Sequence, residues 1–471
     1  MTSTSKFSGI GRLTLAVCLG VLSISSVMAT DLTEIYHRAL RNDPQLREAE
    51  DNHIAALDAH PQAVAALLPQ ISATAGYTHD RLNFQQPGFQ VGLPSSIPTF
   101  STLTTSDNTR WGLSLRQTVF RWDQIVKLSQ SNTVVAQAEV DYRAAQQGAI
   151  LRAAQAYFKV LSTRDRVEYA DASREAIARQ LEQANKRFEV GLIAITDVEE
   201  AKAAADQATA TVIAAKRALA DARDQLRELT GSTAEELARP GDDMPLVGPN
   251  PENEESWVKA ALDQNLDLAS ARLSADIAKD NIAIERSGHS PSIDIVASKS
   301  FANNNGNALA FFDPQQTFSA NSVNHDTQVG IQLTLPLYAG GLTSSKTHEA
   351  VYRHRAARER LERTARATER STRDSYRGVL SEIAQVNALK QALTSSTTAL
   401  QATEAGYDVG TRTAVDVLLA RQRLFDAQSN YATARYDYVI NILTLEQAAG
   451  TLDERQVTRV NAWLNQTVSV K

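Results

Sequence analysis

Two short segments place hydroxyl and carboxylate side chains a few residues after a glycine. Thr196 and Asp197 follow Gly191, and Thr413 and Asp416 follow Gly410. A threonine with an acid three residues later is typical of a capping box, and an acid in the first turn of a helix interacts favourably with the helix dipole. These residues therefore predict two helix N-termini, and the glycines before them predict the ends of the preceding helices.

The residue patterns of enzymes and metal sites are missing from the sequence. The eight histidines are scattered, and none forms a His-x-x-His or HExxH pair. His53 and His60 lie seven residues apart, and we interpret them as surface residues on one face of a helix. No phosphate-binding loop, nucleophile elbow or paired-carboxylate site is present. We expect no catalytic residues, no cofactor and no metal.

Both segments belong to an internal repeat that covers most of the chain. RFEVGLIAITDVEEA (187–201) returns as GYDVGTRTAVDVLLA (406–420) at a constant numbering offset of 219. Further upstream the offset is 222, so that Pro69 aligns with Pro291. A unit of about 220 residues is longer than a solenoid repeat. The sequence predicts a duplicated domain with a first repeat over 30–250 and a second over 251–471.

Residues 1–29 have the pattern of a signal peptide. Lys6 and Arg12 precede the apolar run LTLAVCLGVLSI (13–24), and Val-Met-Ala (27–29) resembles a cleavage site. Cys18, the only cysteine, lies in this run, so we expect a mature chain without disulfides or cysteine-ligated metal. Loss of the two basic residues changes the net charge from −6 to −8, which argues against nucleic acid as a partner.

Proline placement predicts very long helices. None of the thirteen prolines lies between 99 and 239 or after 336, and an interior proline costs a helix about 3 kcal/mol or more. Both blocks are rich in Ala, Gln, Arg and Glu, with small residues at three- and four-residue steps, which is typical of helix-on-helix packing. We expect helices at about 123–189, 196–229, 254–287, 342–408 and 415–448.

Four segments alternate apolar and polar residues with the period of a β-strand, and they predict hairpins at about 70–119 and 292–336. Such alternation is typical of a membrane strand between lipid and lumen, although a half-buried sheet gives the same pattern. The expected signal peptide and the polar loops at 83–108 and 303–325 favour the membrane. We expect Leu113, Ile331 and Leu333 to face lipid, and Ser114, Gln332 and Thr334 to face the lumen.

Four strands are too few to close a membrane barrel. In lipid, each unpaired backbone group at an open edge costs several kcal/mol. The chain must therefore oligomerise if these strands enter a membrane. Two copies would give a barrel filled by side chains, and three would give twelve strands with room for a pore.

The chain resembles the TolC family of outer-membrane efflux and type I secretion channels. The resemblance covers nearly the whole mature chain and rests on YHRALRNDPQL (36–46), RFEVGLIAITDVEEA (187–201), LPLYAGGLTSSK (335–346), GYDVGTRTAVDVL (406–418) and ARYDYVINILTLEQAAGTL (434–452). It implies a homotrimer, with four strands per protomer in a membrane β-barrel and long coiled-coil helices in an α-helical barrel across the periplasm. An equatorial domain would come from 230–257 and the C-terminal segment.

The resemblance also implies a function. The trimer would sit in the cell outer membrane, extend into the periplasm and serve as the passive exit duct of a tripartite efflux pump or a type I secretion system. Its implied partners are outer-membrane lipid, a periplasmic adaptor (membrane fusion) protein and an inner-membrane ABC or RND-type transporter. The adaptor would meet the exposed turns, formed by Val190, Gly191, Leu192, Val409, Gly410 and Thr411.

The resemblance further implies a gate at the periplasmic end. It places Tyr407 and Arg412 in constraining contacts with Thr196 and Asp197, and Asp416 in an acidic ring on the lumen. Family members of this type often carry a second aspartate three residues after the first, where this chain has a leucine, Leu419. We therefore expect one acidic ring, and the effect of this replacement on cation binding stays open.

Two other functions remain compatible with the sequence. The first is a periplasmic coiled-coil adaptor or scaffold, which gives the four amphipathic strands no role. The second is a lipoprotein-type multidrug efflux outer-membrane factor, which the residue before Cys18 disfavours because Val17 is not the small residue of a lipoprotein signal. The transported substrate, and the balance of efflux against protein secretion, cannot be predicted from these residues.

Overall fold

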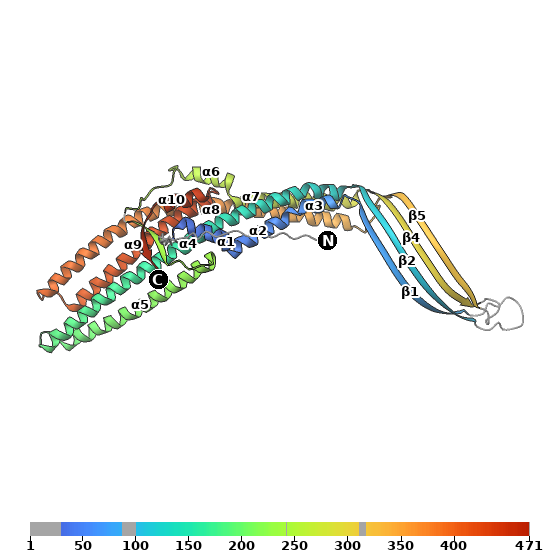
Figure 1. The fold of residues 1–471 in the computed structure, drawn as a ribbon. Coiled ribbons are helices and arrows are strands. Elements are labelled where there is room, and N and C mark those ends of the chain that lie inside the picture. Colours follow the sequence, from blue (N-terminus) through green and yellow to red (C-terminus); the bar gives the residue numbers. More distant parts are fainter. Residues whose placement is uncertain (1–29, 87–99, 242, 310–316, 471) are drawn as a thin grey trace, which may run out of the picture.

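The computed structural model describes residues 30–86, 100–241, 243–309 and 317–470. They form an elongated molecule with long strands at one end and two pairs of helices at the other (Figure 1). The expected signal peptide and the middle parts of both expected loops lie outside the described residues. Among the described helices, none has an apolar stretch long enough to span a membrane.

An antiparallel sheet of four strands forms one end of the molecule. Each repeat supplies one hairpin, and the two hairpins pair through β2 and β4. Residues directly opposite each other share a face, so the pairs Ile293–Leu333 and Ile295–Ile331 gather apolar side chains on one face. The sheet order is β1-β2-β4-β5, with β1 at Gln70–Gln86, β2 at Phe100–Arg121, β4 at Ser292–Leu309 and β5 at Thr317–Thr334.

These strands are longer than the sequence predicts. The expected loops over 83–108 and 303–325 are largely strand where they are described. Pairing continues through polar residues such as His79 opposite Asp107 and Asn304 opposite Ser322. Backbone hydrogen bonds hold an antiparallel ladder whatever the side chains are. A prediction based on side-chain alternation therefore misses the polar ends of these strands.

Two helices run most of the length of the molecule. These are α4 (Trp122–Glu189) and α8 (Leu342–Asp408), with 68 and 67 residues, or about 100 Å each at 1.5 Å per residue. Their halves remote from the sheet pack against the shorter helices α5 (Ile195–Thr230) and α9 (Ala414–Ala448) (Figure 1). Small buried residues such as Ala184 and Ala201 let α4 and α5 approach closely.

Nearer the sheet, the helices form a layer that contains both repeats. Helices α2 (Pro44–Leu57) and α3 (Ala59–Ala65) pack on α4, and α4 packs on α7 (Leu266–Arg286), which packs on α8. A short 3-10 turn at Ser287–His289 leads from α7 toward the sheet. Within this layer the first repeat supplies α2, α3 and α4, and the second supplies α7 and α8, so that α2 and α8 lie at its two edges.

Short elements from distant parts of the chain surround the middle of the two long helices. They are α1 (Leu32–Asn42), β3 (Glu236–Pro240), α6 (Glu254–Gln264), α10 (Glu454–Asn461) and β6 (Leu464–Ser469), with β6 antiparallel to β3. The largest hydrophobic core lies here, around the fully buried side chains of Tyr157, Phe158, Leu161 and Tyr438.

Where the sequence predicts one helix over 254–287, the structure has α6 and α7. Asn265 between them is extended, with ψ of 127°. Its side-chain oxygen accepts a hydrogen bond from the Leu268 amide at 2.9 Å, and its side-chain nitrogen donates to the Ala448 carbonyl at 3.1 Å. Asparagine is a preferred N-cap residue, so the side chain that starts α7 also ends α6.

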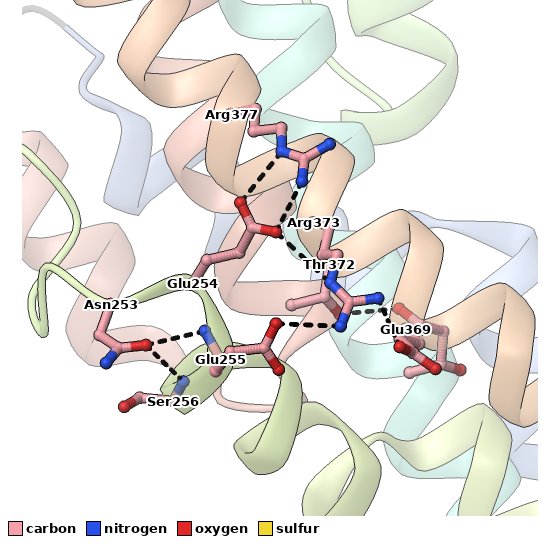
Figure 2. Close-up of polar contacts among 9 residues, drawn as sticks. Asn253, Glu254, Glu255, Ser256, Glu369, Thr372, Arg373 and Arg377 are labelled. Atoms are coloured by element: carbon pink, nitrogen blue, oxygen red, sulfur yellow. Dashed lines mark hydrogen bonds and ion pairs between the residues drawn. The ribbon is translucent and has the colours of Figure 1, made fainter.

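Ion pairs hold α6 against α8 (Figure 2). Arg377 donates to both carboxylate oxygens of Glu254, at 3.0 and 2.8 Å. Arg373 donates to Glu255 at 3.0 Å and also pairs with Glu369. The hydrogen bonds from the Arg373 guanidinium to Glu255 and Glu369 raise the pKa of that arginine. Helix α8 thus binds the carboxylates of a neighbouring helix through arginines on its surface.

Candidate functional site

The two turns singled out in the sequence lie together at the end of the molecule opposite the sheet (Figure 1). Residues 190–194, the first turn, join α4 to α5, and residues 409–413, the second turn, join α8 to α9. Gly191 and Gly410 have φ angles of 73° and 80°, which glycine adopts without steric cost. In both turns the amide after the glycine donates to a carbonyl five residues back, at 2.8 Å. The glycines end the long helices as predicted.

The second turn contains the predicted capping box. The Thr413 hydroxyl oxygen accepts from the Asp416 amide at 3.2 Å, and Asp416 accepts from the Thr413 amide at 2.9 Å. The same carboxylate oxygen accepts from the Thr413 hydroxyl at 3.0 Å. These hydrogen bonds, led by the one from the Thr413 amide, lower the pKa of Asp416 below its ordinary value. Asp416 therefore remains an anion in mildly acidic solution.

The first turn has no such box. Helix α5 begins at Ile195, and its N-cap residue is Ala194, whose side chain cannot accept a hydrogen bond. At the repeat offset of 219, Ala194 is the counterpart of Thr413. Thr196 and Asp197 are the second and third residues of α5. Thr196 is therefore not the capping residue that the sequence predicts. The carboxylate of Asp197 still lies in the first turn of α5, near the positive end of its dipole.

Tyr407 is buried against the second repeat and contacted by the first. Its ring packs with Leu400 and Val417, and the Arg187 guanidinium carbon lies 4.6 Å from the ring centroid. Arg187 also lies 3.8 Å from the Asp408 carboxylate. Within the described chain, the Tyr407 hydroxyl is buried without a hydrogen-bond partner. Arg187, in the last turn of α4, therefore connects the first repeat to Tyr407 and Asp408 in the last turn of α8.

The sequence did not lead us to Arg187, although a signal was present. Its counterpart at the repeat offset is Gly406, so one repeat carries an arginine where the other has no side chain. A Cβ atom at Gly406 would lie 2.8 Å from Cγ of Arg412. The glycine makes room for Arg412 in the second repeat, while the first repeat uses the same position for a cation that reaches Tyr407.

The structure does not join the predicted gate partners within one chain. No hydrogen bond or ion pair links Tyr407 or Arg412 to Thr196 or Asp197 among the described residues. Arg412 is exposed, and its charge helps to lower the pKa of Asp416. A contact between the predicted donors and acceptors would have to form between neighbouring chains or in another state of the turns.

The tips of both turns expose apolar side chains. Val190, Leu192 and Val409 have exposed fractions of 68%, 73% and 76%. Gly191, Gly410 and Thr411 lie exposed beside them. Isolated exposed apolar residues are common, but three at the two adjacent tips form a surface that a protein partner could cover.

A second group of ionisable side chains lies in the middle of the molecule. Asp165 on α4 is buried, and it accepts a hydrogen bond from the hydroxyl of Tyr436 on α9 at 2.6 Å. Arg164 and Arg239 lie 3.4 and 3.7 Å from its other carboxylate oxygen. Burial raises the pKa of Asp165 despite these partners. No group of three or more His, Cys, Asp and Glu side chains suited to a metal ion occurs among the described residues.

Comparisons with known proteins relate the whole chain to one family. A family model described as outer membrane efflux protein matches residues 35–232 and again residues 257–451. The chain is 39% identical over 449 residues to the outer membrane protein TolC of Vibrio cholerae, across 95% of this chain and 97% of that protein. It is 28% identical to the alkaline protease secretion protein AprF of Pseudomonas aeruginosa, across 92% and 87% of the two chains.

A solved structure shares the fold. The outer membrane channel CmeC of Campylobacter jejuni superimposes with a TM-score of 0.71, across 92% of this chain and 90% of that one. The two sequences are 17% identical over this match. The similarity includes the strands as well as the helices, because it covers nearly all of both chains.

Proposed function

The chain belongs to the outer membrane efflux protein family, and from this premise we propose that three copies form a gated exit duct. The protein is an outer-membrane channel that extends into the periplasm and serves as an exit route for efflux and type I secretion. One observation carries this conclusion: the family relationship spans both repeats, and so includes the four strands together with the helices of about 100 Å.

The proposed trimer follows from the edges of the sheet. Strands β1 and β5 lie at its two ends and each pairs with one described strand only. An edge of unpaired backbone groups is costly in lipid and invites pairing with another chain. Three copies joined through these edges supply twelve strands, enough for a barrel with an open lumen. The layer of helices in each copy then supplies one third of the wall of a periplasmic tunnel.

The protein works with partners of an efflux or secretion system. We place the periplasmic adaptor at the tips of the two turns, where Val190, Leu192 and Val409 are exposed. An inner-membrane transporter of the ABC or RND type would supply the energy, because no nucleotide-binding motif is present in this chain.

The proposed gate consists of the two turns in the three protomers. The side chains of Tyr407 and Arg412 carry donor groups that have no hydrogen-bond acceptor among the described residues, and Thr196 and Asp197 carry acceptors. A buried hydroxyl without a partner is costly, which supports a closing contact between Tyr407 and another chain. Arg187 would brace Tyr407 in the closed state, and Asp416 would line the lumen.

Single-channel conductance in planar bilayers tests this function. The purified trimer should conduct weakly, and the variant that combines Tyr407→Phe with Arg412→Ser should conduct more, because it removes both donors from the gate. Arg423→Ser is the matched control, since Arg423 is an exposed arginine of α9 without an ion pair among the described residues. Unchanged conductance in intact double-mutant trimers would remove these residues from the gate. Release of a monomer without detergent would overturn the duct itself.

A further inference from the structure

The contact between the two repeats shows how neighbouring copies can join. In the layer of helices nearer the sheet, α4 of the first repeat packs on α7 of the second repeat. The Gln137 side chain donates to the Ser270 hydroxyl at 3.5 Å, and Gln130 donates to the Asn281 side chain at 3.0 Å. In a closed ring of copies, the end of one second repeat meets the start of the next first repeat. Helix α8 then takes the place of α4, and α2 takes the place of α7.

The repeat offsets give the register of this second junction. At the offset of 219, the counterpart of Gln137 in α8 is Ala356. At the upstream offset of 222, the counterpart of Ser270 in α2 is Glu48. If the two junctions are alike, Glu48 of one copy lies against Ala356 of the next.

Burial supports both offsets. Leu46 on α2 and Leu268 on α7, which the offset of 222 relates, are 3% and 1% exposed. Ser131 on α4 and Ala350 on α8, which the offset of 219 relates, are 5% and 6% exposed. Each pair points its side chains into the layer at equivalent positions. The outward faces next to them are therefore equivalent as well.

The charges at the aligned positions are opposite. Ala356 is exposed and lies between Arg353 and Arg360, about one helical turn from each. On α2, Glu48 and Asp51 are exposed on the outer edge of the layer. Among the described residues, Arg360, Glu48 and Asp51 have no ion pair, and Arg353 has only an exposed contact with Glu349 in its own helix, at 2.5 Å.

The same helix already binds carboxylates in this way. Figure 2 shows Arg373 and Arg377 of α8 paired with Glu254 and Glu255, which begin a different helix of the same chain. Those arginines lie about five to six turns further along α8 than Ala356. Arginine suits such contacts because its planar group donates several hydrogen bonds at once.

We infer that Glu48 of one protomer packs between Arg353 and Arg360 of the next, with Asp51 beside Arg353. This junction rests on the trimer proposed above and adds its residue register and its charge pairing. The contact is heterologous, since different surfaces of the two copies meet, and three such contacts close the ring. The paired charges define how far α2 slides along α8, which hydrophobic packing of alanine-rich helices defines only weakly.

Thiol crosslinking tests the register. In a chain with Cys18→Ser, Glu48→Cys is combined with Ala356→Cys, and the detergent-extracted protein is treated with a short bifunctional thiol reagent. Within one chain the two positions are three helix spacings apart, or about 25–30 Å, so any bridge joins two copies. We expect covalent trimers on denaturing gels. The matched control pairs Glu48→Cys with Arg370→Cys, about 21 Å further along α8, and should give several-fold less product.

Charge reversal tests the ion pairs. Glu48→Arg and Arg360→Glu should each lower the temperature at which the trimer dissociates in detergent, and their combination should restore most of the loss. Arg370→Glu, on the same helix outside the predicted contact, should have little effect. Additive losses in the double variant would refute the pairing.

The parent chain separates this inference from the proposed function. If native mass spectrometry finds a trimer but the Glu48–Ala356 pair gives no more crosslinks than the control pair, the inferred register is wrong and the proposed trimeric duct is unaffected. If the parent chain is not a trimer, both the register and the proposed trimeric duct are wrong.

Discussion

At the scale of single residues, the two turns show how a duplicated motif has become asymmetric. The N-cap residue of the shorter helix differs between the repeats. It is Thr413 before α9, whose side chain caps the helix, and Ala194 before α5, whose side chain cannot. Another position decides whether a cation reaches across the turns, with Arg187 in the first repeat and Gly406 in the second. Helix α5 therefore starts without the side-chain cap that α9 has, and the buried tyrosine, Tyr407, occurs next to the second turn, near the end of α8.

The capping difference can be measured directly. Thr413→Ala should destabilise the first turn of α9 by about 1 kcal/mol, and Ala194→Thr should stabilise α5 by a similar amount, because the threonine oxygen satisfies an amide that is otherwise unpaired. Hydrogen–deuterium exchange of the amides at 414–417 and 195–198 reports both effects. Thr398→Ala is the control, since that hydroxyl bonds inside α8. Equal exchange in the parent and in Thr413→Ala would contradict the cap.

The charge of Asp416 predicts the ion preference of the duct. Asp416→Ala should weaken cation selectivity and block by multivalent cations from the periplasmic side, most clearly at low salt, where charges are least screened. Because its hydrogen bonds lower the pKa of Asp416, the parent should keep its selectivity from pH 7 to pH 5. Reversal potentials in planar bilayers measure this. Selectivity that is the same in both proteins would place Asp416 away from the lumen.

At the scale of elements, the sheet depends on its alternating faces. Leu113, Ile331 and Leu333 are exposed on the surface of the single chain, and cross-strand pairing places Ile331 and Leu333 beside Ile295 and Ile293. The lipid-facing orientation of this face stays a prediction, because the opposite face, with Ser114 and Thr334, is exposed in the single chain as well. The helices, in contrast, bury small side chains against one another, and so pack over a great length.

Arginine substitutions distinguish the two faces of the sheet. Leu113→Arg or Ile331→Arg should cost about 2–4 kcal/mol near the membrane midplane and reduce the yield of trimers extracted from outer membranes. Ser114→Arg or Thr334→Arg should leave the yield nearly unchanged, because those side chains would point into the aqueous lumen. Equal losses on both faces would refute the assigned orientation.

At the scale of the whole molecule, the two repeats are locked together at the middle. Asp165 on α4 accepts from Tyr436 on α9, and Arg239 on β3 lies beside the same carboxylate. Both long-helix pairs and the small β3–β6 sheet therefore meet at one buried carboxylate. The sheet lies on one side of this buried contact, and the two turns of the proposed gate lie on the other.

This buried carboxylate predicts a pH dependence of stability. Burial raises the pKa of Asp165 in the folded protein, so its contribution is fully present below the unfolded pKa and is lost as the pH rises through the folded pKa. Asp165→Asn cannot ionise and still accepts from Tyr436. Its melting temperature relative to the parent should therefore be higher at pH 7 than at pH 4. Tyr436→Phe, which removes the hydrogen bond that lowers this pKa, should show a stronger pH dependence than the parent. A constant difference between parent and Asp165→Asn would contradict the raised pKa.

The sequence by itself determined the duplication, the long helices, the glycines that end them and the alternating strands. These features depend on local rules: proline and glycine placement, and side-chain periodicity. The family resemblance drawn from the same residues was confirmed, together with the outer-membrane location and the role as an exit duct. The trimer and the gate residues stay predictions.

Only the tertiary structure decided which side chains meet across the repeats. Arg187 reaches Tyr407 because two turns from different repeats, far apart in the sequence, lie side by side, and Asn265 divides a predicted helix partly because it bonds to Ala448. The polar ends of the strands pair through their backbones, which side-chain alternation does not reveal. Local patterns define elements, but contacts between distant residues depend on the packing of the whole chain.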